Sequence, residues 1–502
     1  MNSKSKFITT PVYYVNAKPH IGHLYTTIIA DALARFYRQQ GVPAFFLTGT
    51  DEHGIKVQRA AEKNAQSPLK HATVHAKHFQ DLFEKFNLSH NRFIRTTDQD
   101  HIKSVQHFWK TLEQNGHIYS GVYKGWYAAQ DECFYTEKEI VDGKAPTGAD
   151  VELIEEKTHY FRLSQFQQPL LDFFKKNPLF VQPKERFNEV ISFVEQGLED
   201  LSISRASVTW GIPTPSDPAL TIYVWIDALC NYITALGYPD TNSEHFLTYW
   251  PESVHIIGKD ILRFHAIFWP AFLMAAKLPL PQSVVAHGWW INRGKKMSKS
   301  LGNIIDPNEL FDKFGPEPTR YFLLREAPFN SDGYFSEEAL IKRTTADLSN
   351  DLGNLILRTT SMFVRYKAHL LSATYDKNII NNTYSLKDDL TKHMTSYQIT
   401  RFCEKLWSLI ADCNRYVDHT KPWQLFKEKN FEKLTNALFT TLEMIRCIAL
   451  YITPILPDTS DKILNALDIK QSERSWLCLR HESAINSDNR IVSCGVLFPK
   501  EL

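Results

Sequence analysis

The 502-residue sequence predicts an α/β protein: a parallel sheet interrupted by an inserted domain, then an all-α helical bundle. Strand-like and helix-like segments alternate through residues 1–115, and strand-like runs return in residues 211–290. Residues 116–210, rich in glycine and charge, separate these halves. Beyond about residue 347, apolar side chains recur at helical spacing and strand-like runs end. This order indicates a Rossmann-like sheet with an inserted connective domain.

The first half opens with a strand and a helix. Phe7–Tyr14 is β-branched and aromatic, and it leads through a turn into a helix over about His23–Gln40. That helix ends at Gly41, a typical terminating glycine, and the apolar run Ala44–Leu47 suits a strand buried on both faces. Strand, helix, strand in this order predicts parallel pairing with right-handed crossovers.

Later segments continue the two patterns. Three apolar runs predict the resumed strands: Tyr223–Ile226, His255–Ile257 and Ser283–Ala286. Three segments with apolar faces predict helices: Leu348–Lys367, Tyr397–Val417 and Asn430–Ile448. The last segment, Ile491–Phe498, is apolar enough to pack back on the body. The helical segments beyond about residue 347 are expected to form a single domain at the C-terminal end.

Composition excludes several classes of protein. Lys plus Arg total 57 and Asp plus Glu 56, a net charge of +1, which excludes a generic basic coat protein for nucleic acids but not a specific nucleic-acid partner. The longest apolar stretch, Phe264–Ala276, is too short to span a membrane. Seven cysteines without a CxxC pair indicate reduced thiols, and Met1–Lys6 has no apolar signal core. A cytoplasmic protein is expected, with a processed mitochondrial matrix protein as the alternative.

Two histidines lie between the first strand and its helix, in His20-Ile21-Gly22-His23. Their i, i+3 spacing puts both imidazoles at the first turn, where backbone amides and the helix dipole favour anions such as phosphate. Gly22 would let a flat group approach the backbone closely. Alone, the motif favours two surface histidines by roughly two to one, because short motifs often match by chance.

A lysine-serine loop, Lys296-Met297-Ser298-Lys299-Ser300, follows Gly294 and precedes Gly302. Flanking glycines and small polar residues suit a mobile loop that closes over a polyphosphate. Its ammonium groups would neutralise charge on a leaving pyrophosphate. A solvated basic loop is the alternative, and the loop by itself does not decide between them.

Together with the helical C-terminal region, the two motifs resemble those of class I aminoacyl-tRNA synthetases, and the chain is similar to the methionyl-tRNA synthetase family within that class. The narrower resemblance rests on six segments in the family's order, and it extends from residue 7 to residue 498. These segments are Thr10–Asn16, Leu47–Gly54, Tyr223–Leu229, Gly258–His265, Lys296–Ser300 and Asp351–Asn354.

The resemblance implies a domain organisation and an activity. Residues 1–115 and 211–290 would be the halves of the catalytic domain, 116–210 the connective domain, 291–346 the lysine-serine loop and stem-contact region, and 347–502 the anticodon-binding domain. The implied reaction uses ATP with Mg²⁺ to make methionyl-adenylate and pyrophosphate. It then transfers methionyl to the 3′-terminal adenosine of tRNA(Met), including the initiator tRNA. Methionine, ATP and tRNA are the expected partners, with no membrane.

The resemblance also implies roles for individual residues. His20, Gly22, His23 and Lys299 would bind ATP, with both histidines, Lys296 and Lys299 as the catalytic set; Gly258 and Asp260 would hold the ribose. Asp51 would bind the amino group of methionine. The methionine pocket would comprise Val12, Tyr14, Trp225, Tyr232, Phe264, His265 and Trp269. Aromatic walls suit a thioether, although core packing is the ordinary role of a lone buried aromatic residue.

The sequence contains two places where a metal could be considered, one in the inserted domain and one on a helical face with three histidines. Neither is expected to bind a metal. Many members of the family carry zinc knuckles in the inserted domain, but here Ala128, Asp131 and Ala145 hold the ligand positions and Cys133 alone cannot make a site. No structural zinc is therefore predicted. His71, His75 and His78 share one helical face, yet no carboxylate or cysteine completes the set, so a solvated face is favoured by roughly five to one.

Asn354, Arg358 and Trp423 match positions that read the anticodon in the family. Tryptophan can stack on an unpaired base and arginine can bond a base edge, whereas an ordinary helix surface is the alternative. The chain ends at Leu502 without residues for the dimerisation domain of some members, so a monomer is expected.

Three other functions remain as alternatives. A small-molecule nucleotidyltransferase shares the histidine motif, but such enzymes are shorter and lack the lysine-serine loop. A catalytically dead RNA-binding paralogue is disfavoured by intact His20, His23, Asp51, Lys296 and Lys299. A synthetase for a branched aliphatic amino acid would need an editing domain for which this chain has no room.

Overall fold

The computed structural model describes residues 5–128, 133–135, 137–292, 295–296 and 304–499. These residues form two compact units between which the chain passes several times. The sheet unit comprises residues 1–19, 45–84 and 90–287. The bundle unit comprises residues 20–44, 85–89 and 288–502.

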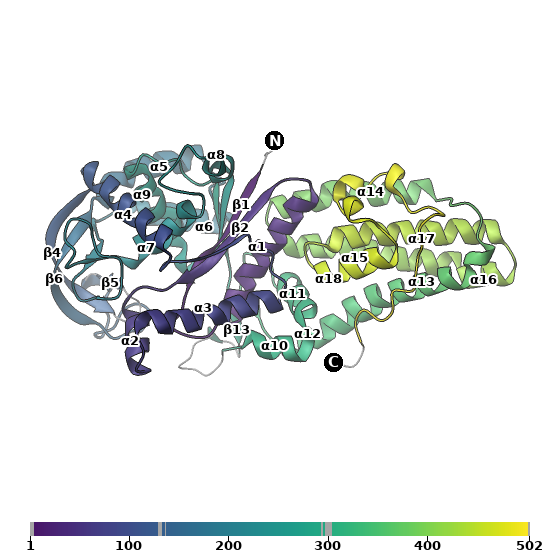
Figure 1. Ribbon diagram of the computed structural model, residues 1–502, viewed down its shortest axis with the longest axis horizontal. Coiled ribbons are helices and arrows are strands. Elements are labelled where there is room, and N and C mark those ends of the chain that lie inside the picture. Colours follow the sequence, from purple (N-terminus) through teal and green to yellow (C-terminus); the bar gives the residue numbers. More distant parts are fainter. Residues whose placement is uncertain (1–4, 129–132, 136, 293–294, 297–303, 500–502) are drawn as a thin grey trace. The chain divides into compact units, whose positions relative to one another are not determined.

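The sheet unit is built on a six-stranded sheet of order β3-β2-β1-β11-β12-β7. The strands pair in parallel in β1–β11, β11–β12, β12–β7 and β2–β3. The strands are β1 (Lys6–Tyr14), β2 (Ala44–Asp51), β3 (Arg92–Arg95), β7 (Val181–Gln182), β11 (Ser253–Gly258) and β12 (Ser283–His287). The predicted α/β class with a parallel sheet is therefore confirmed (Figure 1).

One predicted strand is wrong. The run Tyr223–Ile226 enters the helix α7 (Val224–Thr234), and only the preceding β10 (Thr221–Ile222) is extended. Nearly every side chain of α7 is buried, so a short apolar stretch that looks like a strand is a helix surrounded by core. This difference matters because α7 carries two of the predicted pocket residues, Trp225 and Tyr232.

Other helices of the sheet unit place further site residues. They are α2 (Ile55–Lys63), α3 (Pro68–Lys85), α4 (Gln99–Gln114), α5 (Gln167–Lys176), α6 (Lys184–Glu195), α8 (Glu244–Tyr249) and α9 (Trp269–Ala275). A π-helical turn, Phe264–Phe268, leads directly into α9. One side of α3 differs in part from expectation: His71 is 3% exposed, whereas His75 and His78 are half-buried, so the histidine face is only partly solvated. Burial lowers the pKa of His71, against the effect of its hydrogen bond to the Val15 backbone.

The inserted residues contribute a second, antiparallel sheet of order β5-β4-β6-β8. In Figure 1, β4 (Ile118–Ala128) and β6 (Glu152–Phe161) run side by side as a long pair, flanked by β5 (Cys133–Tyr135) and β8 (Leu201–Ser202). Ala128, Ala145 and Ala149 form a small buried cluster against Tyr135 and Val151. Two of the predicted zinc-ligand positions are thus occupied by packed alanines, while Asp131 lies outside the described residues.

The bundle unit is largely helical. It contains α1 (Ile21–Gln39), α10 (Pro307–Phe314), α11 (Pro316–Arg325), α12 (Glu337–Arg343), α13 (Asn354–Tyr366), α14 (Lys377–Thr395), α15 (Ile399–Thr420), α16 (Pro422–Lys427), α17 (Phe431–Ile452) and α18 (Pro457–Ala466). Helices α13, α14, α15 and α17 pack against one another in the C-terminal part (Figure 1). A small sheet of order β14-β13-β15 joins β13 (Trp290–Asn292), β14 (Lys295–Lys296) and β15 (Gly333–Tyr334). Among the helices in the described ranges, none is long and apolar enough to cross a bilayer.

Candidate functional site

The histidine motif forms the first turn of α1 in the bundle unit. The Nδ1 atom of His20 accepts a hydrogen bond from the Gly22 amide (3.0 Å), and the Nδ1 atom of His23 accepts one from the His20 amide (3.1 Å). This is a reciprocal capping box in which histidines replace the usual Ser and Glu. Because each Nδ1 is an acceptor, each neutral ring carries its proton on Nε2. The two imidazoles therefore present N–H donors at the positive end of a helix, which favours an anion.

Glycine is required inside this turn. The rings of His20 and His23 stack with centroids 3.7 Å apart. A Cβ atom at position 22 would lie 2.9 Å from Cε1 of His20, closer than real side chains come. Local contacts therefore explain the spacing of the motif. The two histidines cap the helix and stack on each other, and Gly22 leaves space for the His20 ring.

The strand that leads to the lysine-serine loop is fixed against α1. Trp290 on β13 makes an edge contact with Tyr25 of α1 (5.8 Å between centroids) and packs on Phe322 of α11 (5.4 Å). The Lys296 backbone lies on β14, paired with Ile291. Lys299 lies outside the described residues, so its predicted role stays a prediction.

In the sheet unit, several predicted residues lie at one edge of the parallel sheet. Val12 and Tyr14 lie at the end of β1, Asp51 at the end of β2, and Gly258 and Asp260 at and just after the end of β11. Since these three strands are neighbours, their carboxyl ends meet at the edge where ligands of such sheets bind. Asp51 is buried.

An aromatic stack and a neutral polar pair are formed by α7 and the π-helical turn before α9. The rings of Trp225 and Phe264 lie parallel with centroids 3.7 Å apart, and both side chains are half-buried. The Nδ1–H group of His265 donates a hydrogen bond to the Ile261 carbonyl (3.0 Å), so its Nε2 accepts a hydrogen bond from the Tyr232 hydroxyl (2.8 Å). Burial lowers the pKa of His265 to about 4, which leaves this pair uncharged at neutral pH.

The predicted residue Trp269 is buried in the core of the sheet unit. Its side chain is 0% exposed and packs among Phe108, Trp250 and Tyr232. Phe268, half-buried and in edge contact with Phe264 (5.4 Å), is a further candidate for the wall of the pocket. Sequence reasoning missed Phe268 because the π-helical turn, which sets which side chains share a face, has no recognisable sequence pattern.

Two further buried carboxylates of the sheet unit were also missed. Glu52 is fully buried and accepts paired hydrogen bonds from Arg95 (2.7 and 2.9 Å). Asp227, on α7, accepts hydrogen bonds from His53 (2.7 Å) and His101 (2.7 Å). Burial alone would raise the pKa of Asp227, but the two histidines outweigh it and lower that pKa to about 2. In the sequence, only the run Asp51-Glu52-His53 at the end of β2 indicated buried carboxylates of this kind.

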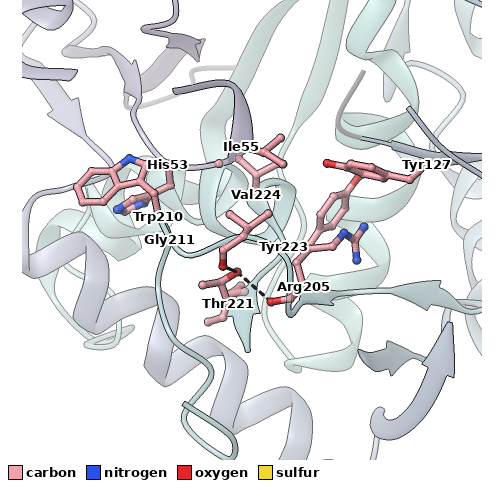
Figure 2. A pocket seen from close by; sticks show the side chains of 12 residues that line it. His53, Ile55, Tyr127, Arg205, Trp210, Gly211, Thr221, Tyr223 and Val224 are labelled. Carbon is pink, nitrogen blue, oxygen red and sulfur yellow. Dashed lines mark hydrogen bonds between the residues drawn. The ribbon is translucent and has the colours of Figure 1, made fainter. Parts of the chain in front are cut away.

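A small pocket lies beside this network (Figure 2). Its residues come from the segment after β2, from the inserted sheet and from the approach to α7. Figure 2 shows Trp210 against His53, with ring centroids 5.3 Å apart, and Tyr127 near Arg205 and Tyr223. The Arg205 guanidinium lies over the Tyr223 ring at 4.7 Å.

The three predicted anticodon residues lie in the bundle unit. Asn354 is exposed at the start of α13, and Arg358, four residues later, lies on the same helical face. Arg358 pairs with Asp418 near the end of α15 (3.1 Å), five residues before Trp423. Trp423 is half-buried at the start of α16. The ion pair thus brings α13 to the segment that carries Trp423.

No group of three or more His, Cys, Asp or Glu side chains in the described part of the chain is arranged to hold a metal ion. His71, His75 and His78, whose rings lie 4.4 and 5.5 Å apart in sequence order, do not form such a group.

Family models match most of the chain. A model described as tRNA synthetases class I (M) matches residues 6–152 and 146–360, and one described as the anticodon binding domain of methionyl tRNA ligase matches residues 371–500. A methionine–tRNA ligase of Rickettsia felis is 44% identical, with 98% of each chain covered. One of Caldanaerobacter subterraneus is 45% identical over 99% of this chain and 79% of the relative.

Solved structures agree. Mycobacterium tuberculosis methionyl-tRNA synthetase in complex with methionyl-adenylate has a TM-score of 0.92 and 40% identity, with 99% of both chains covered. The free form of that enzyme has a TM-score of 0.87 and 38% identity, covering 100% of this chain and 99% of the other.

Proposed function

The chain belongs to the methionyl-tRNA synthetase family of class I tRNA synthetases, and from this premise we propose how its own residues carry out the reaction. The activity is ligation of methionine to tRNA with consumption of ATP through methionyl-adenylate. The observation that carries the proposal is a set of uncharged aromatic contacts together with a buried carboxylate in one unit: Trp225 and Phe264 are stacked, Tyr232 is bonded to His265, and Asp51 lies at the sheet edge.

Methionine would bind through its two ends. Its ammonium group would pair with Asp51, and its thioether would lie against the aromatic walls, where each sulfur–aromatic contact contributes about 0.3–1.5 kcal/mol. The neutral Tyr232–His265 pair suits this side chain because no buried charge needs compensation there. Discrimination by size is weak, since one methylene is worth about 1–3 kcal/mol, so homocysteine is an expected competitor.

Activation then needs positioning and charge stabilisation rather than a side-chain nucleophile. A carboxylate oxygen of methionine attacks the α-phosphorus of ATP, the bond to the β-phosphate oxygen breaks, and pyrophosphate leaves with the electron pair. His20 and His23 would donate Nε2 hydrogens to phosphate oxygens, Gly22 would admit the nucleotide, and Gly258 and Asp260 would hold the ribose. Lys296 and Lys299 would stabilise charge on the pyrophosphate. Mg²⁺, when bound with ATP, would neutralise phosphate charge.

Transfer to tRNA completes the reaction. A hydroxyl of the 3′-terminal adenosine attacks the carbonyl carbon, its proton is released, and AMP leaves. Asn354, Arg358 and Trp423 would read the anticodon, with residues 347–502 as the anticodon-binding domain and 291–346 contacting the tRNA stem. A monomer acting on elongator and initiator tRNA(Met) is the proposed working form.

Amino-acid-dependent ATP–pyrophosphate exchange tests this function. Each of the twenty amino acids and homocysteine is supplied in turn with ATP and Mg²⁺. Exchange with methionine, weaker exchange with homocysteine and none with the rest is the expected result. Equal exchange with a branched aliphatic amino acid, or none with methionine, would contradict the proposal.

A further inference from the structure

A buried carboxylate joins three separate elements next to the proposed methionine site. Asp227 is 1% exposed in the first turn of α7. Its Oδ2 accepts a hydrogen bond from Nδ1 of His53 and its Oδ1 accepts one from Nε2 of His101, both at 2.7 Å. The two histidines are 174 and 126 residues away in sequence, on the segment after β2 and on α4. Both are buried as well.

The cluster is held by charge-assisted hydrogen bonds. An ionised carboxylate only accepts, so each imidazole must turn an N–H toward it. Such bonds are shorter and stronger than neutral ones, and a buried carboxylate that loses one keeps the full cost of its burial. The three side chains therefore have one low-energy arrangement, which makes the cluster a rigid point in the sheet unit.

The cluster joins two segments that carry residues of the proposed site. His53 follows Asp51 by two residues, in the segment that leaves β2. Asp227 follows Trp225 by two residues and precedes Tyr232 by five on the same helix. The His53–Asp227 bond is thus a cross-link from the segment carrying the amine-binding carboxylate to the helix carrying the aromatic wall.

We propose that Asp227 is a positioning residue for methionine: through His53 it fixes the separation between Asp51 and the wall formed by Trp225 and Tyr232. The inference rests on the proposed function and deepens it. Asp227 itself would not touch the substrate, because both of its oxygens are taken by histidines. Methionine must bridge the amine site and the thioether site at once, so a change in their separation costs binding of methionine more than binding of ATP.

The test compares Asp227→Asn and His53→Asn with the wild-type protein in ATP–pyrophosphate exchange. Asparagine keeps the size of Asp227 but removes its charge and one acceptor. For each variant we expect the KM for methionine to rise about tenfold or more, with kcat within about threefold and the KM for ATP unchanged. The matched control is His159→Asn, which removes another buried histidine of the sheet unit, bonded to Ser204, far in sequence from the site. It should lower the melting temperature without changing either KM.

The double variant Asp227→Asn/His53→Asn separates positioning from general destabilisation. If both act through one bond, the double variant raises the KM for methionine no more than the stronger single variant. Multiplicative effects, or folded single variants with an unchanged KM for methionine, would overturn the inference. The inference does not require His101→Asn to change the KM for methionine, because the bond between His101 and Asp227 does not lead to the segment that carries Asp51. A wild-type protein inactive with methionine would instead contradict the proposed function.

Discussion

Two buried aspartates, one in each unit, accept hydrogen bonds from different kinds of side chain. In the sheet unit, Asp227 lies between two histidines. In the bundle unit, Asp31 of α1 lies between Arg320 (2.7 Å) and Arg35 (2.8 Å). Each pKa is lowered to about 2 although burial opposes it. The difference is that a guanidinium is always charged and offers a fixed fork of donors, whereas an imidazole changes both its charge and its tautomer.

The arginine pair serves the architecture of α1. Arg320, fully buried on α11, also donates to the carbonyl groups of Ile455 (3.2 Å) and Pro454 (3.3 Å), just before α18. One guanidinium therefore ties the helix that begins at the histidine motif to the C-terminal helices. The histidine cluster of the sheet unit joins two segments that carry residues of the proposed methionine site. Permanently charged guanidinium groups therefore hold the helices together, whereas titratable imidazole groups lie beside the proposed methionine site.

The largest effect is expected from breaking the arginine tie. Arg320→Met keeps the volume of the side chain but leaves Asp31 with one cation and frees two buried carbonyls. Removal of one partner from a buried ion pair costs about 3–5 kcal/mol, so denaturant unfolding should show a loss of that order. Arg320→Lys should rescue little, because one ammonium cannot reach all three acceptors. The control is Arg415→Met, an exposed residue paired with Asp412, which should leave stability unchanged. An equally small change for Arg320→Met would contradict the role of this tie.

A kinetic effect of the next size is expected in the lysine-serine loop. Lys299→Ala should slow adenylate formation by about 10²-fold or more, because a fixed cation no longer meets the charge on pyrophosphate. Methionine binding should stay nearly intact, since the methionine pocket belongs to the sheet unit. Single-turnover adenylate formation and equilibrium binding of methionine measure the two quantities. Exchange at the full rate would remove Lys299 from the mechanism.

Acid should reduce the contribution of both aspartate clusters to the free energy of unfolding. A carboxyl whose pKa is lower in the folded protein than in the unfolded chain stabilises the fold above the unfolded value, near 3.9, and this is lost as pH falls toward 2. A shift of this size corresponds to about 2–3 kcal/mol for each group. The stability difference between wild type and Asp31→Asn, or wild type and Asp227→Asn, should therefore shrink between pH 5 and pH 2. Urea unfolding at several pH values measures it, and a constant difference would exclude linked ionisation.

Local chemistry made much of this molecule predictable. The histidine motif could be placed at a helix start because its caps and its glycine lie within four residues. The order of strands and helices followed from periodicity. The run Tyr223–Ile226 was misassigned because a short buried helix and a buried strand have the same apolar composition.

Long-range contacts were beyond prediction from one sequence. The Asp227 cluster joins residues more than a hundred positions apart, and no spacing rule relates them. Burial of His71 and of Trp269 likewise depends on which segments meet in the fold. Sequence patterns therefore indicated which residues bear chemistry, whereas the structure was needed to find the groups that hold them in place.

The smallest effect is expected from substitution of Trp423. It compares the two units most directly, because it separates the proposed reading of tRNA by the bundle unit from the proposed binding of methionine by the sheet unit. Stacking of a base on tryptophan is worth about 1–3 kcal/mol, so Trp423→Ala should reduce kcat/KM for tRNA about tenfold or somewhat more. Exchange with methionine and ATP should be unchanged, because adenylate formation does not use tRNA. Trp423→Phe should recover part of the loss by keeping a smaller aromatic face. The same assay on Asp227→Asn should show the opposite pattern, with methionine affected first. If Trp423→Ala slowed both assays equally, its role would be structural, since Trp423 is half-buried at the start of α16.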